Sequence, residues 1–253
     1  MRALPRSWCV RLIGMAVAAA LILPAALGAQ GAMTNGLNYT GAISAAGEID
    51  LYTFTATAGD VIILSLGEVG VGSDFSPWLR LLRPDASLAG SSAGPLAAQL
   101  EVVATLTGTY TVQVASGDVG LDGTGDYTLT LAKTPGAFMI SPGDQGGPLT
   151  NGSNHPGDIH IGDLDMWSFD ATAGDAIIIG IGEAGIDTAF APWIRLKSPT
   201  GQNLGSQSGP LAAQIEAVAT VTGTYTLVVS SGDVGCSWFW RSCDMRRLRR
   251  KAT

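Results

Sequence analysis

The sequence predicts an all-β protein built from two tandem, jelly-roll-like β-sandwich domains of seven to eight short strands each. Three observations predict it: apolar and polar residues alternate over short runs, glycine and proline separate these runs, and one long segment recurs. The stretch 50–120 aligns with 165–235 without a gap, and 41 of the 71 paired residues are identical. The offset of about 115 residues is the size of a whole domain rather than of a solenoid repeat.

The repeat and the composition divide the chain into five expected segments. We expect a signal peptide at 1–29, a first sandwich at 30–133, a linker rich in proline and glycine at 134–150, a second, incomplete sandwich at 151–235, and an aberrant basic tail at 236–253. Cysteine is absent between residues 30 and 235, so neither sandwich can depend on a disulfide.

The N-terminus has the three parts of a secretory signal peptide. Basic residues precede an apolar run at 12–23, and Pro24 and small residues up to Ala29 follow it. The run is short for a membrane span, and no second run of spanning length follows. We therefore expect a secreted or cell-surface protein, cleaved after Gly28 or Ala29, without a stable membrane span after processing.

Charge is segregated along the chain. The whole chain has a net charge of −7, but residues 30–235 contain five basic and twenty acidic residues. Such an acidic body repels nucleic acid, so we expect no nucleic-acid partner. Its simplest role is solubility outside the cell.

Alternation within each copy identifies the residues expected to face the core. Tyr52 and Phe54 share one side of a strand, and Trp167 and Phe169 occupy the same positions in the second copy. The same reasoning assigns to the cores Leu79, Leu81, Tyr110, Val112, Ile194, Leu196, Tyr225 and Leu227.

The first copy resembles a known family. It contains GAISAAGEIDLYTFTATAGD, PWLRLLRPDASL, GTYTVQVAS and GTGDYTLTLA in this order, and these runs resemble the bacterial pre-peptidase C-terminal domain. The second copy departs twice, with Trp167 in place of Tyr52 and without the last strand. The resemblance implies a β-sandwich appended to secreted hydrolases, with relatives that bind collagen or carbohydrate and in some cases calcium.

No motif predicts an enzyme. The segment 90–94 (GSSAG) matches the nucleophile elbow of serine hydrolases, but it lies between predicted strands and its counterpart lacks the central serine. His155 and His160, with Asp158, Asp163 and Asp165 nearby, have no compact metal-ligand spacing. We therefore expect a non-catalytic protein.

Two groups of acidic residues are candidate calcium ligands. Asp50 and Asp165 have the same strand parity as the core aromatics, so each carboxylate either accepts backbone hydrogen bonds or, as the resemblance suggests, binds calcium. Asp118, Asp122 and Asp126 lie in a glycine-rich segment and form the second group.

A repeated Trp–Arg pair is the candidate binding surface. If Leu79 and Leu81 face the core, Trp78 and Arg80 face outward, and Trp193 and Arg195 repeat the arrangement. A Trp beside an Arg can stack on a sugar or on a partner's aromatic ring, or it can simply pack at the sandwich edge.

Two functions fit these features. The first is a binding or accessory module that contacts an extracellular polysaccharide, a cell surface or a protein through the Trp–Arg pairs. The alternative is an appendage or fragment of a larger secreted hydrolase with no affinity of its own.

The match between the copies stops at Gly235, where the composition becomes basic with two cysteines. A run of codons for 245–249 can be read one base later as Cys-Gly-Asp-Tyr, which restores the start of the missing strand. We therefore hypothesise a frameshift after Gly235; the alternative is a native tail in which Cys236 and Cys243 form a disulfide.

Overall fold

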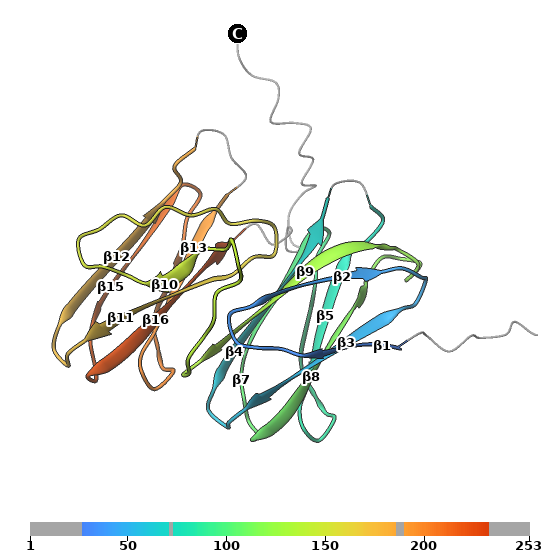
Figure 1. The fold of residues 1–253 in the computed structure, drawn as a ribbon, viewed down its shortest axis with the longest axis horizontal. Coiled ribbons are helices and arrows are strands. Elements are labelled where there is room, and N and C mark those ends of the chain that lie inside the picture. The colour runs from blue at the N-terminus through green and yellow to red at the C-terminus, as the bar shows by residue number, and fades with distance from the viewer. Residues whose placement is uncertain (1–26, 71–72, 186–189, 233–253) are drawn as a thin grey trace, which may run out of the picture.

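A computed structural model describes residues 27–70, 73–185 and 190–232. These residues form sixteen strands and no helix, which confirms the all-β sandwich fold class (Figure 1). The expected signal peptide lies outside the described residues apart from its last three residues, which begin β1, and the tail from residue 236 lies wholly outside them.

Two sheets form the first sandwich. Sheet A has the order β1 (Leu27–Ala32), β3 (Ile49–Ala56), β8 (Gly108–Ser116), β5 (Pro77–Leu82) and β6 (Leu88–Ala93). Sheet B has the order β2 (Asn38–Ile43), β9 (Gly125–Thr134), β4 (Val61–Val69) and β7 (Ala97–Val103). The expected core residues are buried between them: Tyr52, Phe54, Leu79, Leu81, Tyr110 and Val112.

The second sandwich repeats sheet A but only half of sheet B. Sheet C has the order β10 (Gly146–Pro148), β11 (Asp165–Ala171), β16 (Gly223–Ser231), β13 (Pro192–Lys197) and β14 (Asn203–Ser208). Sheet D consists of β12 (Ala176–Gly182) and β15 (Ala212–Val218), the counterparts of β4 and β7. Among the described residues, no strand stands where β2 and β9 stand in the first sandwich.

The smaller sheet D leaves the second core less covered. Ile194, Leu196, Tyr225 and Leu227 are buried as expected, but Trp167 and Phe169 are only half-buried. In the first sandwich, β2 and β9 bring Tyr39 and Tyr127 against the equivalent Tyr52, whereas Trp167 is met by the ring of His155 at 5.3 Å.

The segment expected as a linker contributes to the second sandwich. Residues 146–148 form β10, which pairs in parallel with β11 as β1 pairs with β3. The linker interpretation is therefore wrong for residues 146–148 and for Thr134, the last residue of β9. A three-residue strand with two glycines lacks the alternation by which a strand is recognised in sequence.

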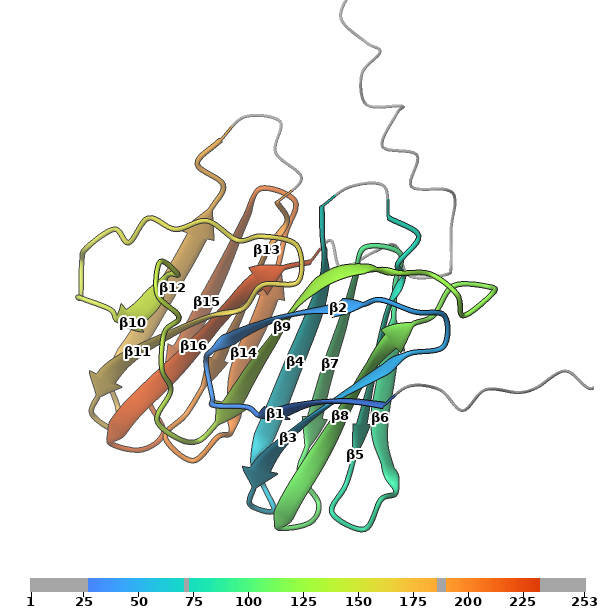
Figure 2. The ribbon, with the colours of Figure 1, turned by 45° about the vertical axis from the view of Figure 1, so that its right-hand side comes forward.

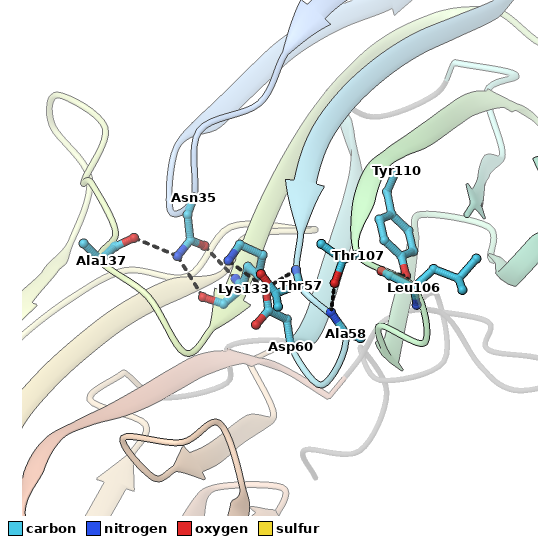
Figure 3. Close-up of polar contacts among 9 residues, drawn as sticks. All are labelled: Asn35, Thr57, Ala58, Asp60, Leu106, Thr107, Tyr110, Lys133 and Ala137. Carbon is cyan, nitrogen blue, oxygen red and sulfur yellow. Dashed lines mark hydrogen bonds and ion pairs between the residues drawn. The ribbon is translucent and has the colours of Figure 1, made fainter. Parts of the chain in front are cut away.

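The sequence blocks ATAGD and TGTYT build the same turn in each copy, and Figure 3 shows this turn in the first copy. The Asp60 carboxylate accepts a hydrogen bond from Thr57 N at 2.9 Å and pairs with Lys133 Nζ at 3.0 Å. The Tyr110 hydroxyl donates to Leu106 O at 2.9 Å, as the Tyr225 hydroxyl donates to Val221 O at 2.7 Å. These blocks recur because they close the ends of the sandwiches.

The two sandwiches pack against each other (Figure 2). The outer face of sheet B supplies Val61, Ile63 and Ala132, and sheet C supplies Met166 and Val228 to the same buried cluster. The four sheets are therefore stacked in the order A, B, C, D. An outer face of each sandwich is used in this contact, sheet B of the first and sheet C of the second.

Candidate functional site

The strand β5 places Trp78 and Arg80 on the outer face of sheet A, because Leu79 and Leu81 point into the core. The Trp78 indole N–H donates to Ser91 Oγ at 3.1 Å, which fixes the ring across β6. The Arg80 guanidinium lies 5.4 Å from the centre of the Trp78 ring, within the range of a cation–π contact. Both side chains remain partly exposed.

The strand β13 repeats this arrangement on sheet C. The Trp193 indole N–H donates to Ser206 Oγ at 2.9 Å, and the Arg195 guanidinium lies 3.5 Å from the centre of the Trp193 ring. The two Trp–Arg pairs are thus built from the same local contacts.

Their surroundings differ completely. Arg195 is only 1% exposed, because the outer face of sheet B covers it. Gln99 Oε1 accepts a hydrogen bond from Arg195 Nη2, and Glu101 Oε2 lies 3.0 Å from Arg195 Nε as an ion pair. Lys197, also 1% exposed, donates to Glu101 Oε1 at 2.7 Å.

Burial lowers the pKa of Arg195 to about 10, and the Glu101 carboxylate opposes this shift. Arg195 therefore remains charged at neutral pH. The expectation that Arg195 faces solvent beside Trp193 is wrong, since alternation specifies only that a side chain points out of its own sandwich. The alternation of residues along a strand does not indicate whether a second sandwich packs on its outer face.

Asp50 is fully buried in the first sandwich. Its Oδ2 accepts a hydrogen bond from the Tyr127 hydroxyl, which also lies 2.9 Å from the Tyr52 hydroxyl. Burial, and then the hydrogen bond to Asp50, raise the pKa of Tyr127 far above its ordinary value. Asp50 thus has a tyrosine donor in place of the backbone donors considered above, and its Oδ1 has no partner.

The group of Asp118, Asp122 and Asp126 does not converge. Asp118 accepts hydrogen bonds from Ser116 Oγ at 2.7 Å and from backbone N–H groups of its own loop, which hold the pKa of its carboxyl well below the usual range. Asp126 is exposed at the start of β9. Within the described residues, these carboxylates are not among those close enough to share a metal ion.

Asp165 belongs to a real cluster of carboxylates. One oxygen each from Asp144, Asp163 and Asp165 lies within 4.8 Å of the others. Asp163 and Asp165 are buried, and Asp165 Oδ1 has no hydrogen-bond partner. The Asn38 amide of the first sandwich donates to Asp144 at 3.0 Å and to Asp163 at 3.2 Å, so the cluster lies at the junction of the sandwiches.

Burial raises the pKa of Asp165 to about 8, with the charges of Asp163 and Asp144 acting in the same direction. Burial also raises the pKa of Asp163, and the charge of Asp144 adds to the shift. An oxygen-only set with an unpartnered buried oxygen fits a hard cation such as Ca²⁺. Sequence reasoning missed Asp144, because only the folded linker brings it to β11.

The structure also shows the surroundings of the serine-hydrolase motif and of His155, two further candidates from the sequence. Residues 90–94 lie largely within β6, a strand, whereas a nucleophile elbow needs a strand-to-helix turn. His155 Nε2 accepts a hydrogen bond from Thr150 N at 3.1 Å. No helix in the described residues has the length and apolarity to cross a membrane.

Comparison with known proteins yields one family and several similar structures. A pre-peptidase C-terminal domain of a Bacillus anthracis collagenase is 20% identical, covers 43% of this chain and 97% of its own, and has a TM-score of 0.34. PliG of Aeromonas hydrophila, a periplasmic inhibitor of g-type lysozyme, is 16% identical, covers 43% and 98%, and has a TM-score of 0.36.

No curated protein matches the chain. The family model of the bacterial pre-peptidase C-terminal domain matches residues 48–116, which comprise the strands from β3 to β8. This span contains the D-x-Y-x-F strand, the A-G-D turn and the G-x-Y strand of the first copy. Residues 48–116 are therefore the part of this chain that is similar to the bacterial pre-peptidase C-terminal domain family.

Proposed function

We propose that this chain is a secreted, non-catalytic accessory module that contacts an extracellular protein through the outer face of sheet A around Trp78 and Arg80. The observation that carries the proposal is the burial of Arg195. At the equivalent position of the second sandwich, the arginine of the Trp–Arg pair is covered by the first sandwich. It donates a hydrogen bond to the Gln99 amide oxygen and forms an ion pair with the Glu101 carboxylate. The outer face of sheet A around Trp78 and Arg80 is thus suited to a flat protein surface that offers two hydrogen-bond acceptors to the arginine.

Among the described residues, the surface beside Trp78 does not form a pocket for a small-molecule ligand. The hollow next to its ring holds only about 60 Å³, well below the roughly 300–1,000 Å³ of ordinary small-molecule pockets. A partly exposed aromatic ring beside an arginine is also typical of the residues that contribute most to protein interfaces.

The test is binding of the full exported chain to arrays of extracellular proteins and glycans. Trp78→Ala and Arg80→Ala should each reduce protein binding by about tenfold or more, because truncation of such a residue costs over ~1.4 kcal/mol. Arg83→Ala is the matched control, since Arg83 lies beyond β5 and bonds to Thr105 and Ser87 in its own sandwich. Binding to glycans alone would contradict the protein partner, and binding to neither array would favour the appendage function.

We also propose that Asp144, Asp163 and Asp165 bind a calcium ion at the junction of the sandwiches. The support is the convergence of three carboxylates, two of them buried, with one oxygen left unpartnered. Ca²⁺ would offset the repulsion among these charges and would bind the folded chain in preference to the unfolded chain.

Millimolar Ca²⁺ should therefore raise the melting temperature, and a chelator should reverse the rise. Asp165→Asn should abolish the effect of Ca²⁺ on the melting temperature. Asp118→Asn should keep this effect, because Asp118 accepts hydrogen bonds within its own loop. A melting temperature that calcium and chelator leave unchanged would refute this site.

A further inference from the structure

The contact between the two sandwiches joins two different faces, the outer face of sheet B and the outer face of sheet C. Because the sandwiches are copies of each other, each end of the stack presents the counterpart of one of these faces. Sheet A of the first sandwich corresponds to sheet C, and sheet D of the second corresponds to sheet B. The chain thus carries both halves of its internal contact again, one at each end.

The arginine, glutamine and glutamate of the polar half of the contact are all repeated. Arg195 is held by Gln99 and Glu101 of β7, and the counterparts of these residues are Arg80, Gln214 and Glu216. Arg80 is partly exposed on sheet A, and Gln214 and Glu216 are exposed on β15. In the absence of a guanidinium, the Gln214 amide donates to Glu216 Oε1 at 2.7 Å.

The apolar half is repeated as well. Ile63 is 1% exposed because it packs with Met166 across the contact. Its counterpart on sheet D, Ile178, is 69% exposed, and Leu51 takes the place of Met166 on sheet A. A depression of about 410 Å³ on sheet D is lined by Gly180, Ile181, Ala212, Ala213 and Gln214.

Gly182 on sheet D gives further evidence for a contact at this surface, because no neighbouring atom of the described residues requires a glycine there. A Cβ added to Gly67 would lie 1.9 Å from Ile161 O, because the loop that ends at Gly162 crosses sheet B there. The counterpart Gly182 is also glycine, although a Cβ there would meet no atom within 4 Å. Glycine inside a strand weakens it and often marks close approach of another backbone. Gly47, the counterpart of Gly162, is likewise open at the other end of the stack.

We propose that the outer face of sheet D binds the outer face of sheet A of a second copy of this chain. Arg80 of one copy inserts between Gln214 and Glu216 of the next, Leu51 covers Ile178, and the loop at Gly47 lies over Gly182. The inference rests on the proposed function, because it identifies the protein partner of the Trp78–Arg80 face as this chain itself.

Such a contact is head-to-tail and extends as a row rather than closing as a two-fold dimer. It should be weaker than the internal contact for two reasons. Leu82 stands where Lys197 stands, so Glu216 meets one cation instead of two. The described part of sheet D also has no counterpart of β9, which supplies Ala132 to the internal contact. Association is therefore expected in the upper micromolar range or above.

Sedimentation velocity of the full exported chain, from ~10 µM to ~1 mM, tests the proposal. We expect reversible growth from monomer to dimer and longer species. Arg80→Glu and Glu216→Arg should each weaken association by roughly 30-fold or more, as for loss of a desolvated charge pair. The control Arg83→Glu makes the same charge change outside the face and should associate like the unmodified chain.

Mixing the two single variants gives the sharpest result. The Glu216→Arg chain keeps Arg80, and the Arg80→Glu chain keeps Glu216, so one intact contact can form between them. The mixture should therefore associate although each single variant alone does not, and the charge-exchanged pair on the remaining two faces should let the row grow beyond a dimer. The double variant with both changes should recover association, because the charges are exchanged.

Three results would overturn the inference: a chain that stays monomeric up to ~1 mM, association that both single variants retain, or a dimer that forms within one single variant alone. Pairing through the open edge of β12 would give the second result. If the chain is monomeric while Trp78→Ala still abolishes binding on the protein array, the proposed function stands and only the self-association falls. If the chain self-associates but binds nothing on the array, the partner is this chain and no other extracellular protein.

Discussion

Removal of the Glu101 carboxylate should destabilise the contact between the sandwiches, because it leaves two buried cations without a counter-charge. Arg195 and Lys197 are each 1% exposed, and Glu101 lies 3.0 Å and 2.7 Å from their nitrogen atoms. Breaking a buried ion pair on one side costs about 3–5 kcal/mol. The Glu101 side chain is 37% exposed, so water can reach the vacated position, and we expect the lower end, about 3 kcal/mol.

Urea unfolding of Glu101→Ala, followed by tryptophan fluorescence in dilute solution, measures this loss. The matched control is Glu216→Ala, the same substitution at the equivalent position of β15, where the carboxylate is exposed and accepts a hydrogen bond from Gln214. It should change the free energy of unfolding by less than about 0.5 kcal/mol. Combining Glu101→Ala with Arg195→Met should recover part of the loss, because the buried charge is then removed as well. Equal effects of Glu101→Ala and Glu216→Ala would refute the buried ion pairs.

Three further predictions concern the second sandwich and its junction. Replacing the residues after Gly235 by the sequence 121–134 should raise the thermal stability of the second sandwich. In the first sandwich, Tyr127, Leu129 and Leu131 are at most 1% exposed, and burial of each such side chain contributes about 1.5–3 kcal/mol. An unchanged melting temperature would contradict this prediction. Gly67→Ala should lower the stability of the junction, since its Cβ meets Ile161 O, while Gly182→Ala in dilute solution should not; equal urea midpoints would count against the close approach. With a chelator present, the melting temperature should fall as the pH rises from about 4 to about 8. The pKa of Asp165 is higher in the folded than in the unfolded chain, so the stability that the protonated carboxyl contributes is complete below the unfolded pKa and is lost as the pH rises through the folded pKa. Asp165→Asn should flatten this slope in a series of thermal melts.

Among the described residues, sheet D has no counterpart of β2 or β9, and the core residues beneath it are less buried than those beneath sheet B. The strand β12 corresponds to β4, whose core residues Ile62, Leu64 and Leu66 are fully buried. Ile177 is 6% exposed, and Ile179 and Ile181 are only half-buried. The frameshift hypothesis concerns residues outside the described ranges, and sequencing of the 3′ end of the gene tests it.

The fold class, the repeat and the inward or outward direction of most strand residues could be predicted from the sequence alone. Tyr52, Leu79 and Tyr110 could be assigned to a core because period-two alternation is a local property of the chain. The turns at Asp60 and Asp175 could be placed for the same reason, since their hydrogen bonds form within a few residues.

Which outer faces are covered, and which carboxylates lie together, depends on the packing of segments that are far apart in the sequence. Arg80 and Arg195 have nearly identical sequence surroundings, yet one is partly exposed and the other is buried by Glu101, which is 94 positions away along the chain from Arg195. Asp144 joins Asp165 because β10 pairs with β11 and brings the preceding segment to it. Alternation reports the direction of a side chain relative to its own sheet, whereas its burial depends on what a distant segment places against that sheet.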